Sequence, residues 1–316
     1  MEFVSISNMA KKGIGIFFIY LMLVVLVAGF ASAGMFDWFG KITGKVTQQN
    51  VNVNITVSNT APTIAAVNSI SAVNLNEGPS STTVTVNFRA SDADGAANLN
   101  DSSAMANFTR AGESVRLNSS CANVATSGND VNYSCSVSMY WFDGAGTWDV
   151  AVFVKDSSNS GAMNTSTTFT VNALTGYTAA PLALTWATLT PGLANQTSNN
   201  DPLLMNNTGN QNIAAGSIQM NTTNLVGETD NSRAIYANNI SVGTATGGNA
   251  ECAGTTMAAN SFTAVTGANL TRGNFSVNDG NTGQEQLYFC LKYVGSELTA
   301  QAYSTTSQGA WSLKIA

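Results

Sequence analysis

The stretch "TWDVAVFVKD", residues 147–156, alternates its side chains between two faces along its whole length. One face carries Trp148, Val150, Val152 and Val154. A period of two with one strongly apolar face is typical of a β-strand that buries that face. The stretch therefore predicts a strand packed on a core, and the neighbouring segments repeat its pattern.

Six further segments between residues 59 and 173 are short, rich in β-branched or aromatic residues, and bounded by Gly, Asn or Asp. They span residues 63–67, 82–90, 105–110, 114–118, 133–141 and 167–174. None of them repeats apolar residues with the 3.6-residue period of a helix. About seven short strands in a segment of this size predict a β-sandwich over residues 59–173.

Three motifs in this region are shared with known surface domains: "NTAPTI" at 59–64, "ASDADG" at 90–95 and "DGAGTWDVAVFVKDSSNSG" at 143–161. The region resembles bacterial and archaeal surface domains of the immunoglobulin-like, PKD and cadherin-like type, which implies an immunoglobulin-like sandwich. One feature departs from antibody domains. Cys121 and Cys135 are only 14 positions apart, so a bond between them would staple a hairpin or loop instead of joining two sheets.

A second domain is predicted after a linker at residues 174–182, where "NALTGYTAAP" (172–181) lacks a strong pattern. Predicted strands in residues 183–316 include 216–225, 234–242, 261–265, 274–278, 286–294, 299–304 and 310–316. The opening "LALTWATLTPGLANQTSNNDPLLMNNTGNQNI" (182–213) reads as a strand, a Pro-Gly turn and a second strand. This opening is similar to that of the TasA and camelysin group, secreted jelly-roll proteins of which some build fibres. The predicted fold is therefore all-β, with an immunoglobulin-like and then a jelly-roll-like sandwich after an N-terminal hydrophobic leader.

The composition is poor in charge. Only 9% of the 316 residues are charged, and 37 Asn, 32 Ser and 36 Thr supply polarity instead. The net charge is −6, and the 12 Lys and Arg residues are scattered. Nucleic-acid binding needs clustered cations to neutralise phosphates, so this class of function is disfavoured.

Residues 1–33 are predicted to be an export signal or a membrane anchor. Lys11 and Lys12 precede an apolar run over residues 14–30, and "ASAG" follows at 31–34. This order is typical of a secretory signal cut after Ala33. Two alternatives stay open: an uncleaved anchor that spans the bilayer, or a pilin-like leader cut after Gly13.

Residues 34–58 are interpreted as an N-terminal arm with a candidate strand, "VNVNITV", at 51–57. Its apolar face carries Val51, Val53, Ile55 and Val57. The strand belongs to the chain's own sandwich, forms a solvated spacer, or is donated to a neighbouring subunit. Trp38, earlier in the arm, is expected to meet a membrane or a partner.

The four cysteines divide two per predicted domain, which predicts the disulfides Cys121–Cys135 and Cys252–Cys290. A zinc site is disfavoured because the chain has no histidine and no CxxC motif. Calcium is the stronger metal hypothesis. Asp92, Asp94 and Asp101 fall in the predicted loop "SDADGAANLND", and Asp156 joins them in cadherin-like relatives. The alternative is an Asx turn made by Asp92 and Asp94.

Twelve N-x-S/T sequons mark candidate glycosylation sites. They begin at Asn54, Asn100, Asn107, Asn118, Asn132, Asn164, Asn195, Asn206, Asn221, Asn239, Asn269 and Asn274. The tryptophans after the arm are predicted to pack in cores and not to stack on sugars. They are Trp141, Trp148, Trp186 and Trp311.

The lack of histidine excludes Ser-His-Asp and His-metal hydrolysis, including the metallopeptidase activity with which the camelysin group is classed. Carboxylate pairs of the glycosidase type are still conceivable, with surface turns as the better account. The candidates are Glu113, Asp143, Asp149, Asp156, Asp230, Glu251 and Glu285.

We expect a non-enzymatic, secreted or cell-surface structural or adhesive protein, archaeal in style and exported by the general secretory route. One alternative is a pilus-like filament subunit that assembles by donor-strand exchange through residues 51–57. Another is a carbohydrate-binding module or glycan-acting enzyme. The expected partners are other surface proteins, further copies of the chain, or glycans. Nucleic acid is not expected, a membrane is expected only through an uncleaved N-terminal segment, and calcium is the one cofactor considered.

Overall fold

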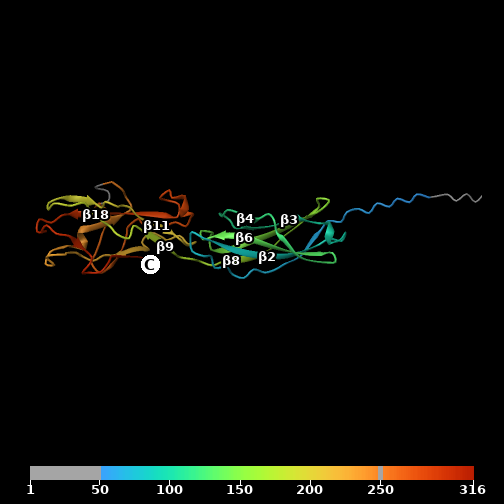
Figure 1. Ribbon diagram of the computed structural model, residues 1–316, viewed down its shortest axis with the longest axis horizontal. Helices are drawn as coiled ribbons and strands as arrows, with labels where there is room; N and C mark the ends of the chain where they lie inside the picture. The colour runs from blue at the N-terminus through green and yellow to red at the C-terminus, as the bar shows by residue number, and fades with distance from the viewer. Residues whose placement is uncertain (1–50, 248–251) are drawn as a thin grey trace, which may run out of the picture. The chain divides into compact units, whose positions relative to one another are not determined.

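The computed structural model describes residues 51–247 and 252–316, and Figure 1 colours them by position in the chain. Residues 59–316 form one compact unit, and the chain up to Ser58 is assigned to another. The described residues confirm the all-β prediction, since they form antiparallel sheets with only three short 3-10 helices. Over these same residues, no helix has the length and apolar character needed to cross a bilayer. The predicted leader and Trp38 lie outside the described part of the chain.

The first sandwich, drawn in blue to yellow-green in Figure 1, has eight strands in two four-stranded sheets. The elements are β1 (Thr63–Val67), β2 (Ser81–Ser91), η1 (Ala96–Asn98), β3 (Leu99–Thr109), β4 (Arg116–Asn118), β5 (Ala122–Ser127), β6 (Asp130–Tyr140), β7 (Gly146–Asp156) and β8 (Gly161–Val171). One sheet has the order β1-β2-β6-β5 and the other β4-β3-β7-β8. The sequence predicted seven of these strands.

The core of the first sandwich follows the predicted alternation. Every second residue of β7, from Trp148 to Val154, is no more than 1% exposed. On the other sheet, β2 and β6 pair in continuous register, with Phe88 opposite Tyr133. Their rings lie 5.1 Å apart between centroids. Each fully buried side chain of this kind contributes about 1.5–3 kcal/mol, so the inward faces hold the two sheets together.

Strand β5 is the strand that the sequence did not predict. All six of its residues are exposed, so "ANVATS" shows no apolar alternation. It forms a strand because it pairs with β6, and because Cys121 just before it is bonded to Cys135 in β6. A strand held by an edge ladder and a disulfide needs no buried face, and therefore leaves no periodic signal.

The second part of the unit contains twelve strands and two 3-10 helices in its described residues. They are β9 (Tyr177–Ala180), β10 (Ala194–Thr197), β11 (Leu203–Asn207), β12 (Ile218–Asn221), β13 (Leu225–Gly227), β14 (Ala234–Ile235), η2 (Ala237–Asn239), β15 (Ile240–Gly243), β16 (Thr255–Thr256), β17 (Phe262–Ala264), η3 (Phe275–Val277), β18 (Gln284–Tyr293), β19 (Tyr303–Ser304) and β20 (Ser312–Ile315).

Strand β18 organises this second part. It lies in the six-stranded sheet β16-β15-β18-β11-β9, where β10 also pairs with it. Two three-stranded sheets accompany it, with the orders β17-β12-β20 and β14-β13-β19. Leu287 and Phe289 of β18 are fully buried in one core with Ile218 and Met220 of β12. The second core is therefore filled from more than one sheet, as a sandwich requires.

Several predicted segments of the second part differ from the structure. The predicted strand at 234–242 is divided by η2 into β14 and β15. Residues 274–278 form η3 instead of a strand, because Asn274 caps Ser276 N at 3.1 Å and Asn278 turns left-handed at φ 54°. The segment before Pro191 forms no strand, although Leu184 and Trp186 pack on the core. Within the predicted linker, Tyr177–Ala180 forms β9 and pairs with β11. In this region, the segment before Pro191 packs side chains on the core without pairing as a strand, whereas the predicted linker does pair.

The segment 51–57 forms no strand, and β1 begins at Thr63. The interpretation of "VNVNITV" as the first strand of the chain's own sandwich is therefore wrong. Its four aliphatic side chains are between 75% and 83% exposed. The spacer and donated-strand interpretations stay open.

Candidate functional site

Where residue 59 enters the first sandwich, Asn and Asp side chains form a hydrogen-bonded cluster. We call it the Asx cluster, and it consists of Asn59, Asp92, Asp94, Asn98 and Asp156. The amide of Asn59 donates to Asp156 Oδ2 at 2.8 Å. The amide of Asn98 donates to Asn59 Oδ1 at 3.2 Å and to Asp92 Oδ2 at 3.3 Å. The cluster thus joins the ends of β2 and β7 to the start of the compact unit.

The Asx cluster accounts for three of the four residues predicted to bind calcium. Asp94 N donates to Asp92 Oδ1 at 2.9 Å, which is the Asx turn weighed as the alternative. Thr60 N donates to Asp94 Oδ2 at 2.7 Å. Ser158 N and Ser160 N both donate to Asp156 Oδ1 at 2.8 Å. All three carboxylates are therefore occupied by N–H donors.

Asp101 lies outside the Asx cluster, so the structure does not bring all four predicted calcium ligands together. Its carboxylate accepts a hydrogen bond from Tyr133 Oη at 2.6 Å and one from Asn123 Nδ2 at 3.0 Å. Burial, together with the hydrogen bond and charge of Asp101, raises the pKa of the Tyr133 hydroxyl. Across residues 51–247 and 252–316, no three Asp, Glu, Cys or His side chains are grouped to hold a metal ion.

The hydrogen bonds of Asp156 also set its acidity. The hydrogen bond from Asn59 is the largest cause that lowers the pKa of Asp156, and the backbone N–H groups of Ser160 and Ser158 add to it. Desolvation opposes this shift, because the side chain is fully buried. The Asx cluster therefore favours the charged form of Asp156.

Three of the carboxylates considered for glycoside hydrolysis are held in ion pairs: Asp143, Glu113 and Asp230, the last with Arg233 at 3.6 Å. Asp143 is fully buried and bonded by the guanidinium of Arg116, with the Arg116 Nε to Asp143 Oδ2 distance at 2.9 Å. Glu113 lies between Arg110 Nη1 at 3.1 Å and Arg272 Nη2 at 2.6 Å. Glu251 lies outside the described residues. Structural pairing is the role that the geometry gives to Asp143 and Glu113.

The tryptophan prediction is confirmed. Trp141 and Trp148 are at most 5% exposed, and Trp148 Nε1 donates to Gly144 O at 3.0 Å. Trp186 and Trp311 are half-buried against the second core. Their indole N–H groups donate to Gln196 O and Thr223 O, each at 3.0 Å. None of these four indole rings presents itself as a sugar-stacking platform.

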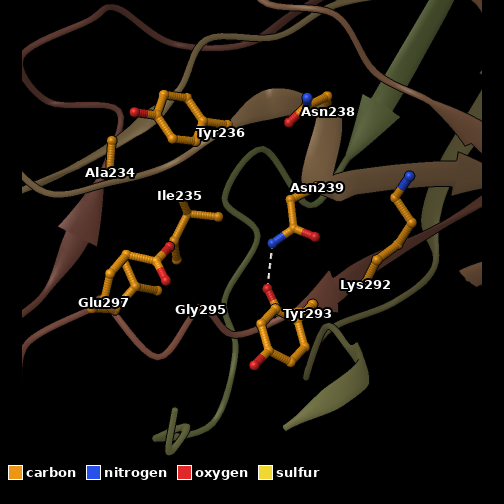
Figure 2. Close-up of a pocket in the computed structure, with 10 residues that line it drawn as sticks. Ala234, Ile235, Tyr236, Asn238, Asn239, Lys292, Tyr293, Gly295 and Glu297 are labelled. Atoms are coloured by element: carbon orange, nitrogen blue, oxygen red, sulfur yellow. Dashed lines mark hydrogen bonds between the residues drawn. The ribbon is translucent and has the colours of Figure 1, made fainter. Parts of the chain in front are cut away.

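Two tyrosines that the sequence analysis missed line a hollow of about 360 Å³ in the second part of the unit (Figure 2). Tyr236 precedes η2 and is 60% exposed, and Tyr293 ends β18 and is 45% exposed. Glu297, from the loop after β18, also lines this hollow. Figure 2 shows these three side chains around one space, with Asn239 beside it. We call this hollow the tyrosine pocket.

The tyrosine pocket is built on a braced framework. The amide of Asn239 donates to Tyr293 O, the bond drawn in Figure 2. Ile240, the next residue, pairs with Leu291 of β18. Lys292 Nζ reaches across to Thr256 Oγ1 at 2.8 Å. The lining residues come from two segments that are more than fifty positions apart, so the pocket cannot be predicted from a local sequence motif.

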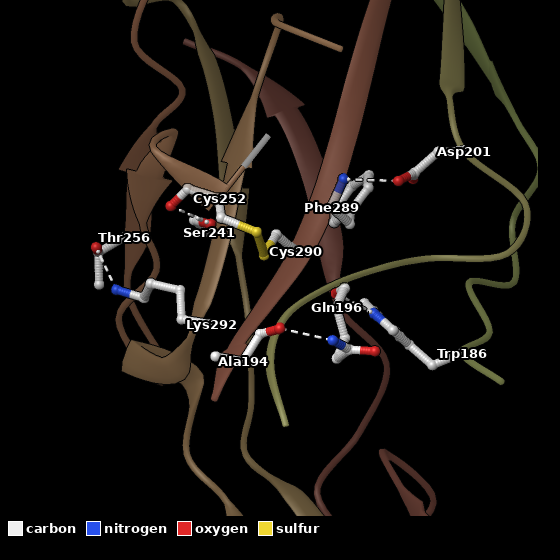
Figure 3. The surroundings of a disulfide bond; sticks show 10 residues. All are labelled: Trp186, Ala194, Gln196, Asp201, Ser241, Cys252, Thr256, Phe289, Cys290 and Lys292. Carbon is white, nitrogen blue, oxygen red and sulfur yellow. Dashed lines mark hydrogen bonds between the residues drawn. A yellow bond between two sulfur atoms is a disulfide. The ribbon is translucent and has the colours of Figure 1, made fainter. Parts of the chain in front are cut away.

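Both predicted disulfides are confirmed. Cys121 is bonded to Cys135, and Cys252 is bonded to Cys290 within β18 (Figure 3). Close to the second bond, Ser241 Oγ donates to Cys252 O at 3.1 Å, and the donation from Lys292 to Thr256 is also visible. Disulfides of this kind persist in oxidising compartments, which agrees with an extracellular location.

None of the twelve sequon asparagines is buried, but their accessibility differs. The exposed ones are Asn54, Asn132, Asn195 and Asn269. Others are only partly exposed, and Asn239 already uses its amide in the tyrosine pocket. Exposure therefore favours the first four as glycan acceptors.

Comparison of the chain with protein-family models and with curated proteins finds no match.

Proposed function

We propose that the chain is a non-enzymatic structural or adhesive protein of the cell surface or the secreted fraction. The strand order β1-β2-β6-β5 facing β4-β3-β7-β8 supports an immunoglobulin-like first domain. The six-stranded sheet packed against β17-β12-β20 supports a jelly-roll-like second domain. One disulfide in each domain stabilises a fold that works outside the cell.

The observation that carries this proposal is the exposed aliphatic face of residues 51–57. Four β-branched side chains on one face of an extended segment are between 75% and 83% exposed. Apolar surface of this kind is normally covered by a partner, and the alternation suits pairing along a sheet edge. The segment therefore favours a protein that associates with others through its N-terminal arm.

A filament subunit is the second candidate, and the same segment favours it. The core of the first sandwich is already filled by its own strands, with Val86 and Phe88 at most 2% exposed. We therefore assign residues 51–57 of one copy to addition along a sheet edge of another copy, not to insertion into its core. Strand β5, which is exposed over its whole length and pairs on one side with β6, offers such an edge.

The test uses the full mature chain with two matched double variants. Val53→Asp with Ile55→Asp places charges on the aliphatic face, and Asn52→Asp with Asn54→Asp places the same charges on the polar face. We expect filaments or oligomers of the wild type in electron microscopy and light scattering. The first variant should abolish them without changing the melting temperature, and the second should keep them.

The outcomes separate the candidates. A wild-type protein that stays monomeric at every concentration would contradict the filament proposal. A melting temperature that falls only in the Val53→Asp, Ile55→Asp variant would show that residues 51–57 stabilise the first sandwich of the same copy. This result would contradict the proposed association. N-terminal sequencing of the native protein tests export. A start at Gly34 indicates the secreted form, a start at Ile14 the pilin-like form, and a start before Lys11 the uncleaved anchor.

A further inference from the structure

We propose that the tyrosine pocket binds a neutral pyranose sugar. This goes beyond the strand-mediated association above, because the pocket contains no residue of the arm. Its volume of about 360 Å³ falls within the range of small-ligand pockets, roughly 300–1,000 Å³.

The exposed aromatic rings are the first argument. Tyr236 and Tyr293 leave much of their ring surface in water, although aromatic side chains gain free energy from burial. A pyranose ring presents C–H groups with partial positive charge on its apolar face. The face of a tyrosine ring carries the complementary negative quadrupole. Stacking a sugar on these rings would cover the apolar surface that the protein itself leaves open.

The polar groups are the second argument. The residues that line the pocket include Tyr236 and Tyr293 with their hydroxyls, Asn238 with its amide and Glu297 with its carboxylate. Within the described ranges, these four groups make no hydrogen bond or ion pair. They offer both donors and acceptors, which is what vicinal sugar hydroxyls need. Few but convergent polar groups around aromatic walls fix the orientation of a ligand.

The charge of the pocket favours a neutral sugar over an acidic one. Lys292 and Glu297, both in its lining, have opposite charges. Lys292 is already bonded to Thr256, and the chain as a whole carries −6. An anionic glycan would therefore meet the free carboxylate of Glu297 without a matching free cation in the lining.

The framework is preorganised, which lowers the entropic cost of binding. The Asn239–Tyr293 hydrogen bond ties η2 to the end of β18. The Cys252–Cys290 disulfide fixes the same strand three positions before Tyr293. Both tyrosines therefore project from braced elements.

The sugar has two possible sources. One is an external glycan, and the other is the chain's own N-linked sugar, because Asn239 begins the sequon Asn239-Ile240-Ser241. Mass spectrometry of the native Asn239 peptide separates them: a sugar on Asn239 assigns the pocket to the chain's own glycan, and a bare Asn239 assigns it to an external one.

The binding test uses the full chain made in a host without N-glycosylation. The probes are maltotriose, cellotriose, mannotriose and chitotriose, measured by saturation-transfer NMR and calorimetry. We expect at least one of them to bind, and Tyr236→Ala or Tyr293→Ala to weaken it by about tenfold or more. Tyr236→Phe keeps the stacking face and should weaken it less.

Tyr140→Ala is the matched control, because Tyr140 is a 38% exposed tyrosine of the first sandwich. It should leave sugar affinity unchanged. The proposal is overturned if none of the four sugars binds, or if the Tyr236→Ala, Tyr293→Ala double variant binds as tightly as the wild type. Neither result depends on filament formation, so this inference and the arm-mediated association fail separately.

Discussion

The Asp143 carboxylate has no exposed surface, and the guanidinium of Arg116 is its ion-pair partner. Arg116 bonds it from two nitrogens while lying over the Tyr140 ring, 4.7 Å from the guanidinium carbon to the ring centroid. Tyr140 N also donates to Asp143 Oδ2 at 2.8 Å. A buried charge that loses its partner cannot recover its hydration, so the pair matters more than its exposed counterparts.

Replacing Arg116 by Met should therefore lower the free energy of unfolding by about 3–5 kcal/mol in urea denaturation. Arg89→Met is the matched control. Arg89 and Asp130 form a 3.6 Å pair with side chains 49% and 35% exposed. Its loss should cost less than about 1 kcal/mol. Equal losses in the two variants would mean that burial of Asp143 carries no special weight.

Asp156 predicts a pH dependence. The pKa of Asp156 in the folded state is lowered, chiefly by the Asn59 amide. The folded protein therefore holds the Asp156 proton less tightly than the unfolded chain does. The stabilisation is then present above the unfolded pKa of about 3.9 and disappears as the pH falls through the lower folded value. Asn59→Ala should raise the folded pKa towards the unfolded one, so the loss of stability in acid should become smaller and be complete at a higher pH. Melting curves recorded from pH ~6 to pH ~2 measure it, and superimposable profiles of the two proteins would contradict it.

At the scale of elements, β5 depends on a covalent bond more than on packing. All its side chains are exposed, and the Cys121–Cys135 bond closes the hairpin region next to it. Cys121→Ser with Cys135→Ser should cost about 3 kcal/mol by the chain-entropy estimate for a loop of about 15 residues. Amide exchange should speed up in β5 well before it does in β7. Unchanged protection of β5 would show that its ladder with β6 is sufficient.

The elements that the sequence predicts are those whose burial repeats every second residue. Strands β2 and β7 each bury one face, so their apolar side chains alternate in the sequence. Strand β5 buries nothing, and η3 is decided by an Asn cap, so neither has that signal. The segment 51–57 shows the opposite case: its side chains alternate in the sequence, but it forms no strand. Alternation shows that a segment is able to pair, but the partner need not lie in the same chain.

The candidate site follows the same logic. The disulfides were predictable because four cysteines, two in each predicted domain, leave few pairings. Of the four predicted calcium ligands, only three lie in the Asx cluster. Proximity in the sequence does not distinguish Asp94, which lies in the turn, from Asp101, which is bonded to Tyr133. The tyrosine pocket was out of reach, because Tyr236 and Tyr293 become neighbours only through the pairing of β15 with β18.

At the scale of the whole compact unit, the two sandwiches are joined by more than a linker. Asn210, 1% exposed, accepts from Leu174 N at 2.7 Å and donates to Asn172 O at 3.0 Å. Arg272 donates to Phe142 O at 3.0 Å and pairs with Glu113, whose side chain is only 6% exposed. These contacts are partly buried, and those of Arg272 are charge-assisted, so they couple the stability of one sandwich to that of the other.

The wild type should consequently unfold in one calorimetric transition, and Asn210→Ala combined with Arg272→Ala should split it into two. The split is expected because each sandwich keeps its own core and disulfide while two of the contacts that couple the sandwiches are removed. Arg233→Ala is the control, since Arg233 pairs with Asp230 inside the second sandwich. Two transitions in the wild type would show that the sandwiches are independent.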